Sequence, residues 1–379
     1  MRILHVSEVH WGGVANLLHH FTAAQSSAGH DVHLLAPPAF PAVAQGSRHD
    51  WAVDRGSPRT FATAAHELRR LARDLKPDII HLHSFVAGFI GRLPGVLPSS
   101  GAAVVYQPHA WSFDLFTDPK KAYLLRSWER WSNSRSTVLV ANCADELAEG
   151  RTNGIDNDGY PIGVAIDLQH FVPPTPEERL SARHALGVTA SRMILVLGRL
   201  TRQKGQDLLL AAWESSPIAD TQLVLVGPGD QRPLADLAPS QWGRSVHAVG
   251  ETHDVRSWIW ACDLLLLPSR YETVSLVVAE AMACGVPVTA TAVNGTREAV
   301  VDGPLAPAGE VVAVGDLRGL LAASAALLDD EQRRRAQSAQ ARCRAEGLFD
   351  PAVVTARLED AYAAAIVKHI RSGPSPAPA

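Results

Sequence analysis

Residues 264–301 read LLLLPSRYETVSLVVAEAMACGVPVTATAVNGTREAVV, and this stretch decides the fold class. The run 264–267 is short, apolar and stops at Pro268, which is typical of a fully buried strand. An apolar helix is predicted over 275–284 and a second strand over 286–291. A strand, a helix and a strand in this order form one unit of a parallel sheet with helices on its faces.

Two glutamates of this stretch, Glu272 in the turn and Glu280 in the helix, are candidates for ligand contacts. The residues that enter the helix between them are Thr273, Val274, Ser275, Leu276 and Val277. The amides of a first helical turn have no partner within the helix and suit a diphosphate. A carboxylate accepts several hydrogen bonds, so Glu280 is expected to bind ribose hydroxyls and Glu272 sugar hydroxyls. The open alternative is that Glu272 caps the helix and Glu280 lies on its wet face.

The composition describes a globular protein of two domains. The chain has 379 residues, too many for one ordinary core, and 46% of them are hydrophobic. A net charge of −4 argues against nucleic acid as a principal partner. The four cysteines have no paired spacing, and the sequence has neither a signal-peptide pattern nor an apolar run of about eighteen residues. A cytoplasmic protein with reduced thiols is therefore expected.

Strand and helix patterns alternate along the whole chain, which predicts an α/β protein of two doubly wound Rossmann-like domains facing a cleft. The predicted strands are 2–6, 31–36, 79–83, 103–106, 137–141, 192–197, 221–226, 246–249, 264–267 and 286–291. The predicted divisions are a first Rossmann-like domain over 1–170, a proline-rich linker over 171–190, a second Rossmann-like domain over 191–350, a crossover helix over 351–371 and a disordered tail over 372–379.

The strand that ends at Leu197 is followed by Gly198, Arg199 and Lys204. A glycine lets the backbone approach a ligand, and two cations at the carboxyl end of a strand suit a diphosphate leaving group. The alternative is a pair of solvated charges at a helix start. Gly227 opens a glycine pair that resembles a dinucleotide fingerprint, but the final glycine of that fingerprint is missing.

The amino-terminal half offers weaker candidates. Gly12 and Gly13 precede a helix that begins after the first strand, and His109 follows a strand and a proline. Trp11 and Trp111 are candidates for an acceptor site. The helical stretch 118–135 mixes basic and aromatic residues. We expect it to be a core helix with a basic solvated face rather than a contact with anionic lipid. No set of His, Cys or Asp has the spacing of metal ligands, so no metal site is expected.

The segments GRLTRQKGQDLLLAAW (198–213), LVLVGPGD (223–230) and 263–303 resemble the carboxyl-terminal domain of family 4 retaining glycosyltransferases of the GT-B fold. The amino-terminal segments 5–37 and 78–84 and the segment 349–366 are similar to the same family. The family often has Gly-Phe-Gly after the first glutamate, where this chain has Thr273-Val274-Ser275.

The resemblance implies a set of roles. Glu272 and Glu280 correspond to the family's pair of glutamates, with Glu272 on the transferred sugar and Glu280 on the ribose. Arg199 and Lys204 would hold the diphosphate. His109 corresponds to the histidine beside the donor sugar, and Gly13 to the glycine loop near the phosphates.

Together these features predict a retaining hexosyltransferase that moves a sugar from a nucleotide-diphosphate donor, with UDP expected, to an acceptor hydroxyl of a small molecule, secondary metabolite, lipid or glycan. No cofactor is required in this interpretation, because the nucleotide sugar is a substrate. The alternatives are another GT-B enzyme such as an epimerase or phosphorylase, a silent sugar-nucleotide-binding partner, and a nicotinamide dehydrogenase.

Overall fold

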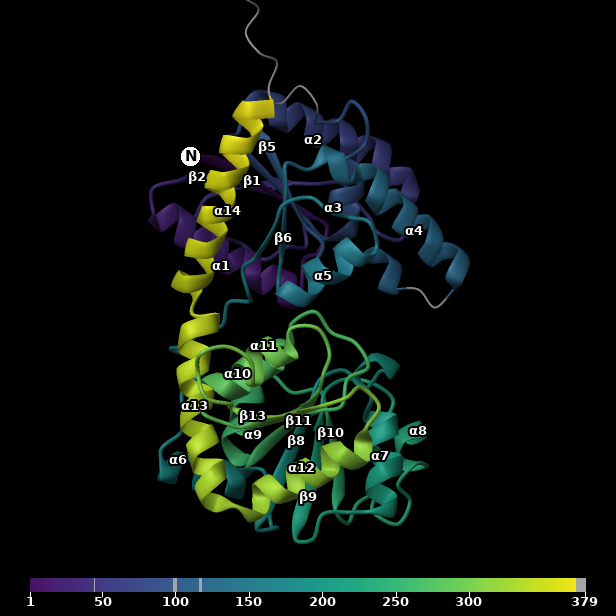
Figure 1. Ribbon diagram of the computed structural model, residues 1–379, viewed down its shortest axis with the longest axis vertical. Coiled ribbons are helices and arrows are strands. Elements are labelled where there is room, and N and C mark those ends of the chain that lie inside the picture. Colours follow the sequence, from purple (N-terminus) through teal and green to yellow (C-terminus); the bar gives the residue numbers. More distant parts are fainter. Residues whose placement is uncertain (44, 98–100, 116–117, 373–379) are drawn as a thin grey trace, which may run out of the picture. The chain divides into compact units, whose positions relative to one another are not determined.

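A computed structural model describes residues 1–43, 45–97, 101–115 and 118–372 (Figure 1). The predicted tail over 372–379 lies outside these ranges apart from its first residue. The chain divides into two compact units: unit 1 is Met1–Ala165 with Pro351–Ala379, and unit 2 is Ile166–Asp350.

Unit 1 contains a parallel sheet that, in the described part of the chain, has the strand order β3-β2-β1-β4-β5-β6-β7. Its strands are β1 (Arg2–Ser7), β2 (Asp31–Ala36), β3 (Ser47–Asp50), β4 (Ile79–His83), β5 (Ala103–Gln107), β6 (Val138–Ala141) and β7 (Gly159–Pro161). Its helices are α1 (Gly13–Ser27), α2 (Phe61–Leu75), α3 (Ser84–Gly91), α4 (Pro119–Ser132), α5 (Ala144–Thr152) and α14 (Pro351–Ser372), with short 3-10 turns at Pro58–Thr60, Ser112–Leu115 and Asn133–Arg135.

Unit 2 contains a second parallel sheet, and its described strands follow the order β10-β9-β8-β11-β12-β13. Its strands are β8 (Arg192–Leu197), β9 (Thr221–Val226), β10 (Val246–Gly250), β11 (Leu264–Leu267), β12 (Val288–Thr291) and β13 (Gly309–Val312). Its helices are α6 (Pro176–Ala185), α7 (Gln206–Ser215), α8 (Arg232–Ala235), α9 (Val255–Ala261), α10 (Leu276–Ala283), α11 (Thr296–Val300), α12 (Leu317–Asp329) and α13 (Glu331–Phe349), with a 3-10 turn at Arg202–Lys204.

The prediction of two doubly wound parallel sheets is therefore confirmed. In each sheet the strand order reverses direction at one place, between β1 and β4 in unit 1 and between β8 and β11 in unit 2. Open parallel sheets bind ligands outside the carboxyl ends of the strands at such a reversal. In each unit, a ligand site is therefore expected at the carboxyl ends of the strands beside the reversal.

Each face of the unit 1 sheet has its own core. On one face, side chains of the sheet pack against α1 and against Val354, Leu358 and Tyr362 of α14. On the other face they pack against α2 and α3. Figure 1 shows α14 in yellow lying beside α1 on this unit, although its residues come from the end of the chain.

The segment 171–190, predicted to be a linker, contains helix α6 within unit 2. Thr175 accepts a hydrogen bond from the backbone of Glu178, and the Glu178 side chain accepts one from the backbone of Thr175 at 2.8 Å. Pro176 occupies the first helical position, where its missing N–H costs nothing. The three prolines of this segment suggested a linker, but Pro176 together with Thr175 and Glu178 forms a helix start signal.

Three strands lie outside the predicted set, namely β3, β7 and β13. Each is an edge strand of its sheet. Their sequences, SRHD, GYP and GEVV, contain no continuous apolar run. Among the described helices, none combines the length and apolar character that crossing a bilayer requires.

Leu358 of α14 has no exposed surface and packs in the core that α14 and α1 share with the sheet. We predict that Leu358→Ala lowers the free energy of unfolding of unit 1 by about 2–5 kcal/mol, through lost apolar contact and the cavity left behind. Thermal unfolding measures the effect. The matched control is Ile370→Ala on the same helix, where the side chain is 71% exposed and little change is expected. Equal melting of the two variants would contradict the packing of α14 on unit 1.

Candidate functional site

The predicted donor-site residues of unit 2 gather at the strand reversal between β8 and β11. Lys204 lies in the loop after β8, and Glu272 lies in the loop after β11. The Lys204 ammonium donates a hydrogen bond of 2.6 Å to Glu272 Oε1, and the Ser269 hydroxyl donates one of 2.8 Å to the same oxygen. Two groups that are 68 residues apart in sequence are thus joined in one ion pair with little exposed surface.

Glycines let these loops approach one another. Gly205 has a left-handed backbone with φ of 71°, and a Cβ there would lie 2.0 Å from the carbonyl oxygen of Pro268. A Cβ on Gly227 would lie 2.2 Å from the carbonyl oxygen of Gly198. Any side chain at either position would force the backbones apart. The glycines after β8 and β9 therefore fix where Lys204 meets its partner.

A second brace joins the same two loops and was missed by the sequence analysis. The Arg270 guanidinium donates two hydrogen bonds of 2.7 Å to the two carboxylate oxygens of Asp207. It also donates to the carbonyl oxygen of Arg202 at 2.6 Å. This guanidinium holds the pKa of the Asp207 carboxyl below its usual range through these hydrogen bonds. Nothing local marks Arg270 and Asp207 as partners, because they are 63 residues apart.

The amino end of α10 offers hydrogen-bond donors beside this ion pair. Ser275 is the N-cap, its hydroxyl does not cap the helix, and the first turn contains no acidic residue. The buried Ser275 hydroxyl also has no partner among the described residues. The amides of Leu276 and Val277 and the positive end of the helix dipole are therefore available to an anion. The alternative that Glu272 caps this helix is not what the geometry shows, since Glu272 pairs with Lys204.

Arg199 and Glu280 complete this group. The Arg199 side chain is exposed, and the Arg199 carbonyl oxygen accepts a hydrogen bond of 3.0 Å from the side-chain amide of Gln206. Glu280 lies one turn into α10, and burial raises the pKa of its carboxyl to about 7. The Glu280 side chain is half-buried, and no described residue donates a hydrogen bond to its carboxyl. A carboxyl that is short of partners is suited to receive ligand hydroxyls.

The candidates in unit 1 are described separately. Gly12 is the N-cap of α1 with φ of 76°, and Gly13 is the first residue of that helix. Trp11 beside them is 64% exposed, so an acceptor can reach its ring. His109 follows β5 and is half-buried, and its Nε2 lies 3.0 Å from Nδ1 of His83.

Trp111 requires a correction. Its side chain is only 1% exposed, and its Nε1 donates a hydrogen bond of 2.7 Å to the carbonyl oxygen of Glu146. Its ring also stacks on Phe113, with the ring centroids 5.7 Å apart. Trp111 is therefore a core residue and offers no surface to an acceptor. The sequence could not distinguish it from Trp11, because both follow a strand.

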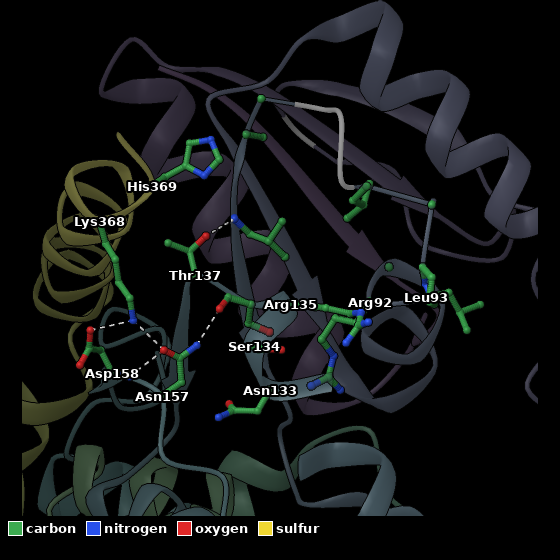
Figure 2. A pocket seen from close by; sticks show the side chains of 18 of the residues that line it. Arg92, Leu93, Asn133, Ser134, Arg135, Thr137, Asn157, Asp158, Lys368 and His369 are labelled. Carbon is green, nitrogen blue, oxygen red and sulfur yellow. Dashed lines mark hydrogen bonds and ion pairs between the residues drawn. The ribbon is translucent and has the colours of Figure 1, made fainter. Parts of the chain in front are cut away.

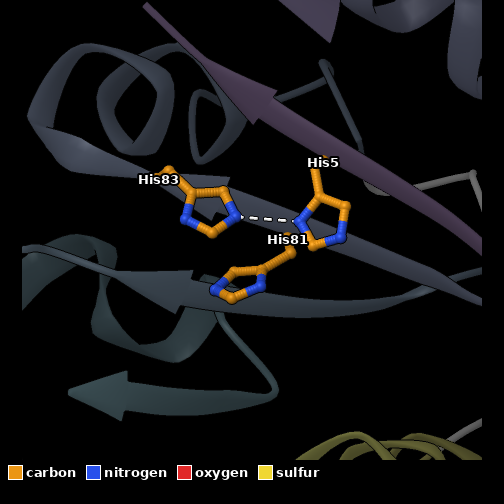
Figure 3. Close-up of side chains that lie close together, drawn as sticks. All are labelled: His5, His81 and His83. Atoms are coloured by element: carbon orange, nitrogen blue, oxygen red, sulfur yellow. Dashed lines mark hydrogen bonds between the residues drawn. The ribbon is translucent and has the colours of Figure 1, made fainter. Parts of the chain in front are cut away.

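Three histidines of unit 1 form a cluster that spacing did not indicate (Figure 3). The ring nitrogens of His5, His81 and His83 lie within 4.8 Å of one another, and all three side chains are buried. Nδ1 of His5 and Nε2 of His83 are 2.9 Å apart and share a hydrogen bond. Nδ1 of His81 lies 2.7 Å from the hydroxyl oxygen of Tyr362 instead, and its Nε2 has no hydrogen-bond partner among the described residues. All three rings are buried, so no exposed edge of them gives a hydrated ion a route inward. We interpret the cluster as a hydrogen-bonded core rather than a metal centre.

A cavity in unit 1 lies at the opposite edge of the sheet from these groups. It has a volume of about 640 Å³ and is lined by residues just before β5, β6 and β7, such as Ala102 and Thr137. Figure 2 shows Lys368 reaching Asn157 and Asp158 at 2.7 and 2.8 Å on one wall of this cavity. Because ligands of parallel sheets bind at the carboxyl ends of the strands, this cavity is not part of the site described above.

Two family models cover most of the chain. Residues 11–170 match the model described as Glycosyltransferase Family 4, and residues 191–330 match the model described as Glycosyl transferases group 1. A D-inositol 3-phosphate glycosyltransferase 1 of Catenulispora acidiphila is 30% identical over 342 residues, which are 83% of this chain and 78% of that protein. A D-inositol 3-phosphate glycosyltransferase of Xylanimonas cellulosilytica is 35% identical over 247 residues, but the match spans only 57% of its length.

The fold also occurs among solved structures. The Anabaena protein HepE, in a crystal structure with UDP-glucose, superposes with a TM-score of 0.76 over 96% of this chain and 99% of that chain. At 20% sequence identity this likeness bears on the fold alone.

The raised pKa of Glu280 generates a prediction about stability. Because the folded-state pKa of about 7 lies above the ordinary value of 4.5, the folded protein binds more protons than the unfolded chain between these pH values. Stability of unit 2 therefore falls as pH rises from 4.5 through 7. Glu280→Gln, which cannot ionise, should melt like the wild type at pH 4.5 and at a higher temperature than the wild type at pH 8. Thermal unfolding at both pH values measures this.

The control for this prediction is Glu251→Gln, which removes an exposed carboxylate from the same unit. Glu251→Gln should show the same difference in melting temperature between pH 4.5 and pH 8 as the wild type. If Glu280→Gln melts at or below the wild-type temperature at pH 8, the carboxyl is not buried as the structure has it.

Proposed function

Because this chain belongs to the family 4 glycosyltransferases, a retaining family of the GT-B fold, we propose that it transfers a hexosyl group from a nucleotide-diphosphate sugar to an acceptor hydroxyl. The observation that carries the proposal is the set of groups at the β8–β11 strand reversal. Two cations, two carboxyl groups and the free amino end of a helix lie together there.

Each group has a proposed task in holding the donor. Arg199, the Lys204 ammonium and the amides of Leu276 and Val277 bind the diphosphate, because they supply positive charge and donors in one place. Glu280 accepts hydrogen bonds from the ribose hydroxyls. These hydrogen bonds offset the desolvation cost of its charged carboxylate. Gly198 and Gly227 let the backbone approach the phosphates without a side chain between them.

Glu272 has a different proposed task because it is already paired. Its Oε1 accepts from Lys204 and Ser269, so the carboxylate has a fixed orientation before any ligand arrives. It then accepts hydroxyls of the transferred sugar, and it holds Lys204 toward the diphosphate. A preorganised arrangement of this kind stabilises charge that builds on the leaving group without a reorganisation cost.

The proposed reaction needs no side-chain base. The acceptor hydroxyl attacks the anomeric carbon on the face from which the diphosphate leaves. A phosphate oxygen takes the hydroxyl proton as the bond to the leaving group breaks. Positive charge from Arg199, Lys204 and the helix amides replaces the metal ion that such a diphosphate otherwise requires, so we expect no cofactor.

We propose UDP as the nucleotide of the donor, supported by the UDP-glucose complex of HepE. The residues Thr273, Val274 and Ser275 line the entry to α10, where added side chains narrow the space for the sugar.

A thermal-shift panel of UDP-, GDP- and ADP-sugars tests the proposal, because a ligand that binds only the folded state raises the melting temperature. Stabilisation by a nicotinamide dinucleotide and by no sugar nucleotide would overturn it.

A mutation test separates the proposed phosphate-binding charges from their neighbours. We predict that Lys204→Ala and Arg199→Ala each lower the turnover number for transfer by about 100-fold or more, because the leaving diphosphate loses its stabilisation. Arg202→Ala is the matched control: Arg202 is an exposed cation in the same loop, and its side chain has no assigned contact with the donor. Release of nucleoside diphosphate and formation of the glycoside are measured together.

Equal activity of Lys204→Ala and Arg202→Ala would contradict the assigned roles. Formation of the glycoside with inverted configuration would contradict the retaining reaction. Nucleotide release without any glycosylated acceptor would favour another sugar-nucleotide chemistry on the same fold.

A further inference from the structure

The contact between Arg270 and Asp207 joins the same two loops of unit 2 as the ion pair between Lys204 and Glu272. The loop after β8 contains Lys204 and leads into α7, whose second residue is Asp207. The loop after β11 contains Arg270 and, two residues later, Glu272. We call Arg270 and Asp207 together the guanidinium brace. Each loop therefore contributes one member of the ion pair and the loops are joined a second time by the guanidinium brace.

Arg270 holds the loop after β8 on both sides of Lys204. Before Lys204, the backbone N–H of Arg270 donates a hydrogen bond of 2.8 Å to the carbonyl oxygen of Gln203. The Arg270 Nη1 donates one of 2.6 Å to the carbonyl oxygen of Arg202. After Lys204, Nη1 and Nη2 of Arg270 each donate a hydrogen bond of 2.7 Å to one carboxylate oxygen of Asp207. A fork of two parallel hydrogen bonds fixes the direction of a contact as well as its length.

The segment 202–207 needs these contacts because it has little regular structure of its own. Residues Arg202–Lys204 form a single 3-10 turn, and Gly205 after it has a left-handed backbone with φ of 71°. Runs of 3-10 helix are short because their hydrogen-bond geometry is poor. The Lys204 side chain is a flexible stem of four carbons. The position of its ammonium therefore depends on contacts that other residues make with this segment.

Glu272, the partner of Lys204, has a separate support. Its Oε1 accepts a hydrogen bond from the Ser269 hydroxyl in its own loop. The Thr291 hydroxyl on β12 donates one of 2.6 Å to the carbonyl oxygen of Ser269, and neither of these two side chains is exposed. The Glu272 carboxylate is thus held by contacts that do not involve the loop after β8, whereas the backbone around Lys204 is held by the guanidinium brace.

We propose that Arg270 and Asp207 are positioning residues, which hold the segment 202–207 so that the Lys204 ammonium reaches the leaving diphosphate. This inference rests on the proposed function, because that function places the diphosphate at Lys204. Groups that stabilise charge on a leaving group are most effective when they are in place before the reaction. The guanidinium brace supplies this placement without contacting the diphosphate, because Asp207 engages both arms of the guanidinium.

Loss of the guanidinium brace is expected to leave unit 2 folded. The Arg270 side chain is 20% exposed and that of Asp207 is 39% exposed. Ion pairs that water reaches add little to stability, and the hydrophobic core of unit 2 is formed by other residues. An effect on turnover can therefore be measured apart from an effect on folding.

Three variants and one double variant test the proposal. Arg270→Ala removes the fork. Asp207→Asn is the conservative variant, because its amide keeps one oxygen that accepts from the guanidinium. Arg192→Ala is the matched control: it breaks the ion pair of 2.6 Å between Arg192 and Asp329 at the amino end of β8, the end away from Lys204. The double variant of Lys204→Ala with Arg270→Ala shows whether the guanidinium brace acts through Lys204.

The first measurement is the hydrogen exchange of the backbone amides of residues 202–207 in the full chain. We expect exchange about tenfold faster or more in Arg270→Ala, because fewer contacts oppose local opening of this segment. Exchange in Arg192→Ala should equal that of the wild type.

The second measurement is the pair of kinetic constants for transfer, kcat and KM for the donor. We expect Arg270→Ala to lower kcat by about tenfold or more, because a misplaced charge stabilises the transition state less, with KM little changed. The fall in Asp207→Asn should be smaller. The double variant should have the kcat of Lys204→Ala alone, because losses at residues that act as a unit do not multiply. If Arg270→Ala does not fold, Asp207→Asn takes its place in every comparison.

Unchanged exchange in Arg270→Ala would overturn the proposal, as would losses of kcat that multiply in the double variant. An equal loss of kcat in Arg270→Ala and Arg192→Ala would do the same. The two proposals fail separately. If the wild type transfers no sugar, the proposed function fails, while hydrogen exchange still decides whether the guanidinium brace holds the segment 202–207.

Discussion

The parallel pairing of β8 with β11 is the contact on which the group of charged residues at the strand reversal of unit 2 depends. Leu264 of β11 lies beside Ile194 of β8, so the loops that leave these strands must run next to each other. The missing side chain of Gly205 then allows its backbone to touch the carbonyl of Pro268. The ion pair between Lys204 and Glu272 follows from this approach. An ion pair with so little exposed surface adds little net stability, because desolvation offsets its attraction, and this agrees with the binding role that we propose for Lys204 and Glu272.

Much of the fold was predictable because a strand buried on both faces needs a continuous apolar run. The runs at 194–197, 223–226 and 264–267 could not be read in another way. The short strands β3, β7 and β13 have no such run, because each is an edge strand that pairs with one described neighbour and is only partly buried. The segment 171–190 was predicted to be a linker but contains a helix, because helix starts and turns use the same residue types.

The candidate site was predictable as a set of residues but not as a set of contacts. The sequence placed Arg199, Lys204 and Glu272 in loops that follow strands and Glu280 in the helix after one of those loops, and strand ends of one parallel sheet share an edge. The pairing of Arg270 with Asp207 and of His5 with His83 depends on which strands are neighbours. Strand order is a property of the whole sheet, and no window of residues contains it. The sequence also does not reveal how deeply a side chain is buried, so the buried Trp111 could not be distinguished from the exposed Trp11.

The return of α14 to unit 1 has a consequence for how the protein is made. Unit 2 is one continuous segment, Ile166–Asp350, whereas unit 1 is completed by residues from 351 onward. During synthesis the sheet of unit 1 emerges first, but one of its apolar faces stays partly uncovered until the last helix leaves the ribosome. Unit 2 can acquire its own core in the meantime. Unit 1 is therefore completed only after unit 2 has been synthesised, and its uncovered apolar face is prone to aggregation in the meantime.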